Sequence, residues 1–258
     1  MKTKNFAVQA LPALLSITLP LLASADETNW AGPYFGLNAG YGWGKSDVST
    51  TTVFSPTGYF NSTSVPAINK LSDGTIKPKG WLGGLTAGYG FQSGAVVSGV
   101  ELDLDALSMD ESRRYTATYP CCAPSTFTNT QKVKADWLLS ARGRVGYAVN
   151  QSLFYATGGL GATQLKSQNH FTDNFGPGAN ESSSESKTKY GWVLGLGYEH
   201  AMQNNWSIKA EYLHADFGHV SSTSNNLRWF GVSWPTNTFS NSANLGIDLF
   251  RIGINKKW

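Results

Sequence analysis

Apolar and polar side chains alternate along eight segments of the chain. In the first, residues 33–44, Phe35, Leu37 and Trp43 alternate with glycines and Asn38. A period of two predicts β-strands that each have one apolar face. The other seven segments are residues 80–92, 96–107, 132–148, 153–165, 190–201, 206–218 and 249–258.

The connections between these segments alternate in length. Short turns are expected around residues 93–94, 150–151 and 204–205. The long connections, rich in serine, threonine, asparagine, glycine and proline, are residues 45–79, 107–131, 166–188 and 219–243. Short turns at one end and long loops at the other are typical of outer-membrane barrels. We therefore predict an all-β fold, an eight-stranded antiparallel transmembrane β-barrel with short periplasmic turns and long extracellular loops.

The two faces of the strands differ in residue type, and this difference indicates which face contacts water. A soluble barrel such as a lipocalin also has eight alternating strands, but it packs its apolar face inside. Here large aromatic residues occur on almost every strand and would overfill a narrow bore, so we expect the apolar face to contact lipid. The charged residues assigned to the bore are Glu101, Asp103, Asp105, Asp136, Arg142, Arg144, Glu199, Lys209, Glu211 and Arg251.

The aromatic residues of the apolar face sort into two levels, as expected for the two girdles of a membrane barrel. One level contains Trp43, Trp81 and Trp192, and the other contains Tyr89, Tyr147, Tyr155, Tyr198, Trp206 and Trp258. The facing of the segment 153–165 is ambiguous, and Tyr155 is assigned outward. Lys256 and Asp248 also fall on the lipid face, close to its two rims.

The first 25 residues have the features of a signal peptide. Lys2 and Lys4 precede an apolar stretch, and Ala23-Ser24-Ala25 provides small residues for cleavage. Pro12 and Pro20 interrupt the stretch, which argues against an N-terminal membrane helix. We expect residues 1–25 to be removed and residues 26–258 to form one barrel domain. The full chain has a net charge of +3, and losing two lysines lowers it further, which argues against a nucleic-acid partner.

The two cysteines are adjacent, at Cys121 and Cys122, within a predicted extracellular loop. An exported chain meets an oxidising compartment. A vicinal disulfide, an intermolecular bridge and a loop pair without chemistry all remain open from the sequence. No His or Cys stands at metal-ligand spacing beside them, so a zinc site is not expected.

The eight segments in this order, among them GWLGGLTAGYGFQ, ADWLLSARGRVGYA and the terminal LFRIGINKKW, resemble the porin-like, immunogenic small outer-membrane proteins of alphaproteobacteria, within the OmpA-like barrel group. The resemblance extends over residues 26–258. It implies an eight-stranded barrel, insertion by the outer-membrane assembly machinery, contact with outer-membrane lipids and lipopolysaccharide, and surface-exposed loops. It implies no single activity, because members are described as structural proteins, weak porins or haem binders.

We expect the charged bore residues to form a paired network that blocks conduction, with Arg142, Arg144, Glu101, Asp103 and Glu211 at its centre. These residues would have a structural role. We expect no catalytic residues, no metal site and no cofactor site. A small selective pore lined by the same charges is the alternative.

The top of the segment 206–218 holds a His, Asp and Ser set that could in principle form a catalytic triad. The set is His214, Asp216, His219, Ser221 and Ser222. Rim residues of this kind usually contact water, so we do not expect an enzyme.

The long loops could bind a host or small-molecule ligand. His170 and His219, with Phe171, Phe175, Trp229, Phe230 and Trp234, could hold haem, and the segment around Trp229 could serve adhesion. The alternative is that these loops pack on each other over the barrel mouth.

Overall fold

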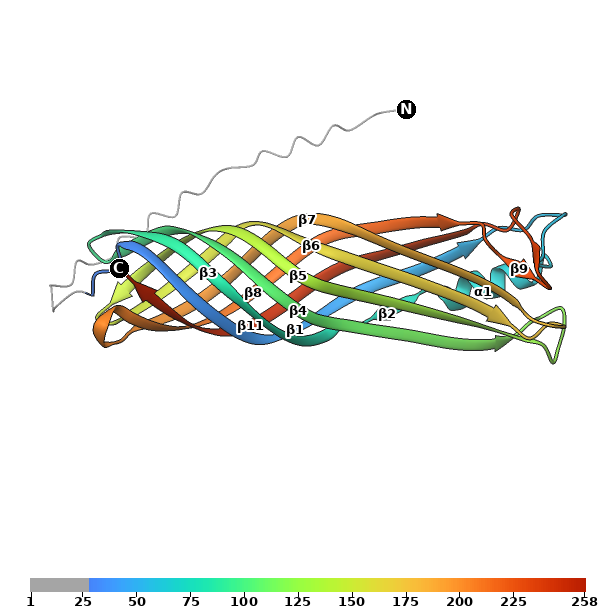
Figure 1. The fold of residues 1–258 in the computed structure, drawn as a ribbon, viewed down its shortest axis with the longest axis horizontal. Coiled ribbons are helices and arrows are strands. Elements are labelled where there is room, and N and C mark those ends of the chain that lie inside the picture. The colour runs from blue at the N-terminus through green and yellow to red at the C-terminus, as the bar shows by residue number, and fades with distance from the viewer. Residues whose placement is uncertain (1–27) are drawn as a thin grey trace, which may run out of the picture.

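Eight long antiparallel strands form a closed ring in the structure, a computed structural model that describes residues 28–258 (Figure 1). The predicted signal peptide, residues 1–25, lies outside the described residues. β1 pairs with β11 and β7 pairs with β8, which closes the ring. The strands are β1 (Gly32–Thr52), β3 (Lys79–Ser93), β4 (Val96–Thr118), β5 (Thr126–Val149), β6 (Ser152–Asp173), β7 (Ala179–Ala201), β8 (Trp206–Ser224) and β11 (Phe239–Lys257).

Shorter elements connect the long strands. The helix α1 (Ser64–Ser72) and the short strands β2 (Gly74–Ile76), β9 (Arg228–Trp229) and β10 (Val232–Ser233) lie at the end of the barrel that carries the long connections. The 3-10 turn η1 (Gln203–Asn205) connects β7 and β8 at the other end. In the described part of the chain, no helix has the length and apolar character needed to cross a bilayer.

The tight turns follow from residues that tolerate a left-handed backbone. Gly94 has φ +57° between β3 and β4, and Asn150 has φ +55° between β5 and β6. Asn204 and Asn205, at φ +59° and +58°, turn the chain from β7 into β8. Glycine and asparagine are the residues that adopt this conformation at least cost, so the short turns lie where the sequence predicted them.

Most of the residues predicted as long loops are strand residues, which corrects the sequence prediction. β4 continues to Thr118 and β5 begins at Thr126, so only a short tip separates them. Alternation persists in this region, with Leu107 and Met109 buried while the residues between and beside them are exposed. The outward face is polar because it meets water rather than lipid, and this polarity makes the strands resemble loops in sequence.

Beyond the membrane-spanning ring, the wall divides into two facing sheets. β7 pairs with β8 only as far as Trp192 and Asp216, although both strands continue. β3 begins at Lys79, and beyond it β1 pairs with the short β2. One sheet is therefore β4–β5–β6–β7 and the other is β8–β11–β1, and the two diverge toward the end where α1 lies (Figure 1).

The bore is filled in layers, and the inward residues of β11 pass through each of them. Arg251 lies in a charged layer, and Leu249 and Ile247 lie in an apolar cluster beyond it. Asn241 belongs to a small polar layer, in which the Thr50 hydroxyl donates a hydrogen bond of 2.7 Å to its side chain. Phe239 reaches the aromatic core beneath the extracellular tips.

Candidate functional site

Nine of the ten charged residues assigned to the bore from the sequence are buried inside the barrel. Each is no more than 5% exposed, and the side chains come from β4, β5, β7, β8 and β11. The nine are Glu101, Asp103, Asp105, Arg142, Arg144, Glu199, Lys209, Glu211 and Arg251. Inward alternation on separate strands brings them together across the bore.

Arg251 lies at the centre of the network, where it hydrogen-bonds three carboxylates and lies 3.6 Å from a fourth, that of Glu101. Its Nη1 lies 3.0 Å from Asp105 Oδ2, its Nη2 lies 2.8 Å from Asp103 Oδ1, and its Nε donates to Glu211 Oε2 at 2.7 Å. Charge-assisted bonds from a planar guanidinium fix the geometry of several acids at once.

Two further cations complete this layer. Arg142 Nη2 lies 2.7 Å from Asp103 Oδ2, and its Nη1 lies 3.2 Å from Glu211 Oε1. Arg142 also pairs with Glu101, and Lys209 Nζ lies 3.2 Å from the same glutamate. Each carboxylate of the layer therefore has at least one cation within bonding distance, as buried charges require.

A second layer lies toward the short-turn end. Arg144 Nη1 donates to Glu199 Oε2 at 2.9 Å, and its guanidinium lies 4.5 Å from the centre of the Tyr34 ring and 5.5 Å from that of Tyr155. Tyr34 donates to Glu101 at 2.9 Å and Tyr155 donates to Glu211 at 3.0 Å. Hydroxyl groups thus link the two layers.

The inward position of Tyr155 corrects the sequence prediction, which placed it in a lipid-facing girdle. Tyr155 is 5% exposed, whereas the preceding Phe154 is 56% exposed and packs against Tyr198 at 5.0 Å between ring centres. Phe154 and Tyr155 are adjacent and both aromatic, so composition does not distinguish the two faces of this strand.

Glycines make room for the two buried tyrosine rings. A Cβ atom at Gly88 would lie 2.3 Å from the Tyr34 ring, and one at Gly197 would lie 2.2 Å from the Tyr155 ring. Both distances are far below van der Waals contact, so any larger residue at these glycines would displace a tyrosine. Gly88 and Gly197 thus serve the packing of the bore.

Asp136 is the bore assignment that the structure contradicts. The strand register shifts between Ala135 and Leu138 of β5, where it pairs with β6. A shift of one residue exchanges the two faces of a strand. Beyond the bulge Val133 and Ala135 therefore point inward, and the Asp136 side chain is 25% exposed on the outer surface between two lysines.

The outward aromatic residues lie at two levels along the strands. Seven of the nine predicted girdle residues are exposed: Trp43, Trp81, Trp192, Tyr89, Tyr198, Trp206 and Trp258. Tyr147 is half-buried on the outer side and Tyr155 is the inward exception. Trp137, which the prediction did not include, is half-buried on β5.

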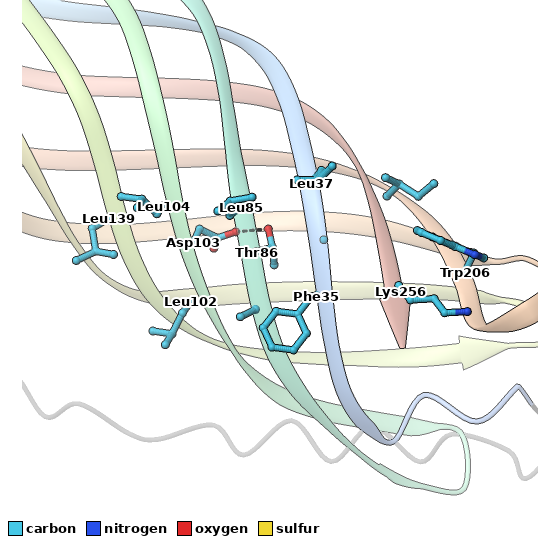
Figure 2. A pocket seen from close by; sticks show the side chains of 13 residues that line it. Phe35, Leu37, Leu85, Thr86, Leu102, Asp103, Leu104, Leu139, Trp206 and Lys256 are labelled. Carbon is cyan, nitrogen blue, oxygen red and sulfur yellow. Dashed lines mark hydrogen bonds between the residues drawn. The ribbon is translucent and has the colours of Figure 1, made fainter. Parts of the chain in front are cut away.

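Between these levels the outer surface is aliphatic. This surface has a hollow of about 570 Å³, lined by Leu102, Leu104, Leu139 and Trp206 among others. Figure 2 shows the side chains that line it. The three leucines are 46–58% exposed. Asp103 lies among them in sequence but is turned inward.

The His, Asp and Ser residues considered at the rim do not come together as a triad. His214 Nδ1 lies 2.8 Å from Oδ1 of Asp248 on β11, and the Tyr212 hydroxyl donates to the same oxygen at 2.5 Å. Asp216 instead accepts a bond from the Gly218 backbone N–H at 2.7 Å. Asp248 thus lies on the outer face near a rim, as predicted, and both His214 and Tyr212 bond to it.

The structure does not bring His170 and His219 into a common site. His170 is exposed and contacts the Ser182 hydroxyl at 2.7 Å, whereas its neighbour Phe171 is fully buried. The backbone carbonyl of His219 accepts a bond from Lys189 at 2.6 Å. The loop aromatics mostly pack on each other, and loop binding of a host or small-molecule ligand stays a prediction.

The extracellular tips form an aromatic core, which we call the cap. Its buried residues are Phe60, Val65, Ile68, Tyr119, Phe127, Phe171, Ala179, Leu227 and Phe239. Trp229 and Trp234 pack against it. Cys121 and Cys122 form a disulfide with each other at the edge of the cap.

Asp173 holds the cap together through both of its carboxylate oxygens. Its Oδ2 accepts bonds from the Tyr59 and Tyr119 hydroxyls at 2.8 and 2.7 Å, and its Oδ1 accepts from the Ala179 N–H at 2.7 Å. Burial raises the pKa of both phenols above the ordinary value of about 10, and the neighbouring carboxylate raises it further.

This arrangement predicts a cap that loosens at alkaline pH. Above about pH 10 an unfolded tyrosine loses its proton while Tyr59 and Tyr119 keep theirs, so the unfolded form binds fewer protons and cap stability falls as pH rises. Fluorescence of Trp229 and Trp234 measured from pH 8 to 12 should change in this range. A variant carrying both Tyr59→Phe and Tyr119→Phe should lose most of that dependence, and an unchanged alkaline transition would contradict the assignment.

The sequence prediction missed the apolar layer of the bore. Leu107, Met109, Leu138, Phe217 and Leu249 are each at most 7% exposed and lie beyond the charged network in one cluster. Met109 falls in a segment predicted as a loop, and Leu107 lies at the boundary of that segment. The alternation of these two residues with Ser108 and Asp110 was a usable signal.

Three kinds of comparison place the chain among known proteins. Residues 10–246 match the model of the outer membrane protein beta-barrel domain family. The 31 kDa outer-membrane immunogenic protein of Brucella melitensis is 34% identical over 219 residues, which is 83% of each chain. The 25 kDa outer-membrane immunogenic protein of Brucella abortus is 30% identical over 83% of this chain and 77% of its own.

Solved structures include small outer-membrane proteins of similar fold. Outer membrane protein OprG of Pseudomonas aeruginosa is 11% identical, with a TM-score of 0.46 over 88% of this chain and 97% of its own. Neisserial surface protein A is 14% identical, with a TM-score of 0.34 over 87% and 97%. With the family match and the Brucella relatives, the chain belongs to the outer membrane protein beta-barrel domain family and spans the outer membrane of Gram-negative bacteria.

Proposed function

We propose that this protein is a structural barrel of the outer membrane whose bore is closed to ions and solutes, and which holds a folded cap at the cell surface. The observation that carries this proposal is the central charged layer. The side chains of Arg142, Lys209 and Arg251 are 0% exposed, and each pairs with acids of other strands.

The apolar layer supports the same function. Leu138 and Leu249 are fully buried beyond the charged layer, and Phe217 is 1% exposed. An ion crossing the bore would have to displace paired charges and then leave water entirely in an apolar region, and each step is costly. A barrel built for transport would keep a wetted path, as larger porins do.

Planar-bilayer recording of the folded protein tests the proposal. We expect no large, stable conductance steps at neutral pH, whereas a trimeric porin inserted in the same bilayer supplies the positive control. Heat-modifiable gel mobility should confirm that the recorded sample is a folded barrel. Large and stable steps from such a sample would refute the closed bore and favour a small selective pore.

A charge-neutralised variant sharpens the test. Exchanging Asp105 for Asn and Arg251 for Met removes the Asp105–Arg251 ion pair of 3.0 Å. It also removes the ion pairs of Arg251 with Asp103, Glu211 and Glu101, while the apolar layer stays in place. We expect this variant to stay non-conducting, because two layers block the bore independently. Conduction by the folded double variant would show that the charged layer alone closes the barrel.

A further inference from the structure

The bulge in β5 creates a cluster of charges on the outer surface of the barrel. Asp136 Oδ1 lies 2.8 Å from Lys134 Nζ, and Asp136 Oδ2 lies 2.6 Å from Lys166 Nζ on β6. All three side chains reach solvent, at 42%, 25% and 38% exposure for Lys134, Asp136 and Lys166. Without the register shift, Lys134 and Asp136 would point into the bore, so the bulge presents them outward.

The cluster lies just beyond the hydrocarbon core of the membrane. Lys134 lies on β5 three residues closer to the cap than Trp137. Trp137 belongs to the level of Trp43, Trp81 and Trp192. Three residues of a tilted strand rise about 8 Å. The headgroup region extends about 5–8 Å beyond the hydrocarbon on each side of a bilayer, so the lysines lie at the depth of the lipid headgroups.

β3 and β1, which lie on the far side of β4 from β5, repeat this order of tryptophan and lysine. Lys45 lies two residues beyond Trp43 on β1, and Lys79 lies two residues beyond Trp81 on β3, and both lysines are exposed. The nearby acid Asp110 is already paired with Lys132 at 3.0 Å. Lys45 is likewise paired with Asp47 at 3.4 Å. Lys134 and Lys166 share one acid, so their cluster has one surplus cation.

We propose that Lys134 and Lys166 bind a phosphate group of a phosphorylated glycolipid in the outer leaflet, the chemistry that lipid A presents. Each ammonium group has three N–H donors. One oxygen of Asp136 lies near each ammonium group, which leaves N–H donors on both lysines for a further acceptor. Asp136 holds the two ammonium groups close together, so that the oxygens of one phosphate can accept from both. The phosphate carries more negative charge than the carboxylate, and the three protein groups have a net charge of +1.

This surface is independent of the closed bore, because its side chains lie on the opposite face of β5 and β6 from the charged network. Its continuity with the lipid-facing surface favours a membrane lipid over a soluble anion. The acyl chains would contact the exposed aliphatic side chains nearer the bilayer centre, such as Leu139 and Leu160.

Native mass spectrometry of the detergent-purified folded barrel tests the proposal with bisphosphorylated lipid A as the probe. A variant carrying Lys134→Gln and Lys166→Gln should bind this lipid about thirtyfold more weakly, from the loss of two cations near an anionic surface. A variant carrying Lys134→Arg and Lys166→Arg should keep most of the affinity. The matched control is Lys70→Gln, which removes an exposed lysine from α1, far from the membrane level.

Two further probes identify the ligand source. Lipid A stripped of its phosphates should bind the natural protein as weakly as it binds the Gln variant. Inorganic pyrophosphate at the same concentration should not bind measurably, and equal binding would overturn a lipid headgroup as the ligand. Unchanged affinity of the Gln variant for bisphosphorylated lipid A, with heat-modifiable mobility intact, would overturn the site.

Discussion

Replacing Arg251 with methionine is expected to lower the free energy of unfolding of the barrel by about 3–5 kcal/mol. Arg251 pairs with Asp103, Asp105 and Glu211, and its side chain is 0% exposed, so the acids depend on it rather than on bulk water for their partner. The three carboxylates would then share the remaining cations of the layer and repel each other. Urea unfolding in detergent micelles, followed by tryptophan fluorescence, measures this loss.

Two variants control this result. Lys187→Met removes a cation whose side chain is 52% exposed and should change stability by less than about 0.5 kcal/mol. Adding Asp105→Asn to Arg251→Met should recover part of the loss, because Asp105 then no longer carries a charge without its partner. Equal midpoints for the Arg251 and Lys187 variants would show that the network does not stabilise the fold.

Replacing Phe171 with alanine is expected to destabilise the cap by about 3–5 kcal/mol while leaving the membrane-spanning ring folded. Phe171 is fully buried and its ring lies within 5.4–6.1 Å of those of Phe60, Phe127 and Phe239. Its removal leaves a cavity between the two sheets that the rigid strands cannot close. The rate of cleavage by an added protease at the tips should rise sharply.

The expected effect is local, so the measurement needs both a control and a second readout. Phe175→Ala truncates a phenylalanine that is 42% exposed at the same end and should leave the cleavage rate nearly unchanged. The temperature at which gel mobility shifts should move little in either variant, because the ring below the cap is intact. Loss of the folded gel band in the Phe171 variant would mean that cap and ring unfold together.

The sequence was most informative where lipid constrains it. Within the bilayer one face of each strand must be apolar, so period-two alternation alone places residues such as Glu101 and Arg251 inside. The contacts between them could not be derived, since they depend on the shear of the barrel and on which strands face each other across the bore.

Two assignments failed for identifiable reasons. Asp136 depends on a bulge, and the residues at Ala135–Leu138 carry no glycine or proline that would indicate one. Tyr155 follows Phe154, so both faces of that strand begin with an aromatic residue. In each case the deciding factor is the register of neighbouring strands, which alternation within one strand does not contain.

The strands are longer than the sequence predicts, because polar residues continue in the strands beyond the membrane and resemble loop residues. Above the membrane the outward face is hydrophilic and the inward face apolar, as in soluble sheets. Val133 and Leu165 are buried in this region although their strands are rich in polar residues. The alternation of apolar residues persists there, but the apolar face points into the barrel instead of toward lipid.

The division of the wall into two prolonged sheets determines how far the tips stand from the cell. The eleven residues from Thr126 to Asp136 lie beyond Trp137, and a tilted strand of that length rises about 28 Å. A soluble macromolecule can therefore reach the tips without touching lipid. Substitutions at the tips lie far from the part of the wall that must insert into the membrane, so the tips can change while that part stays constant.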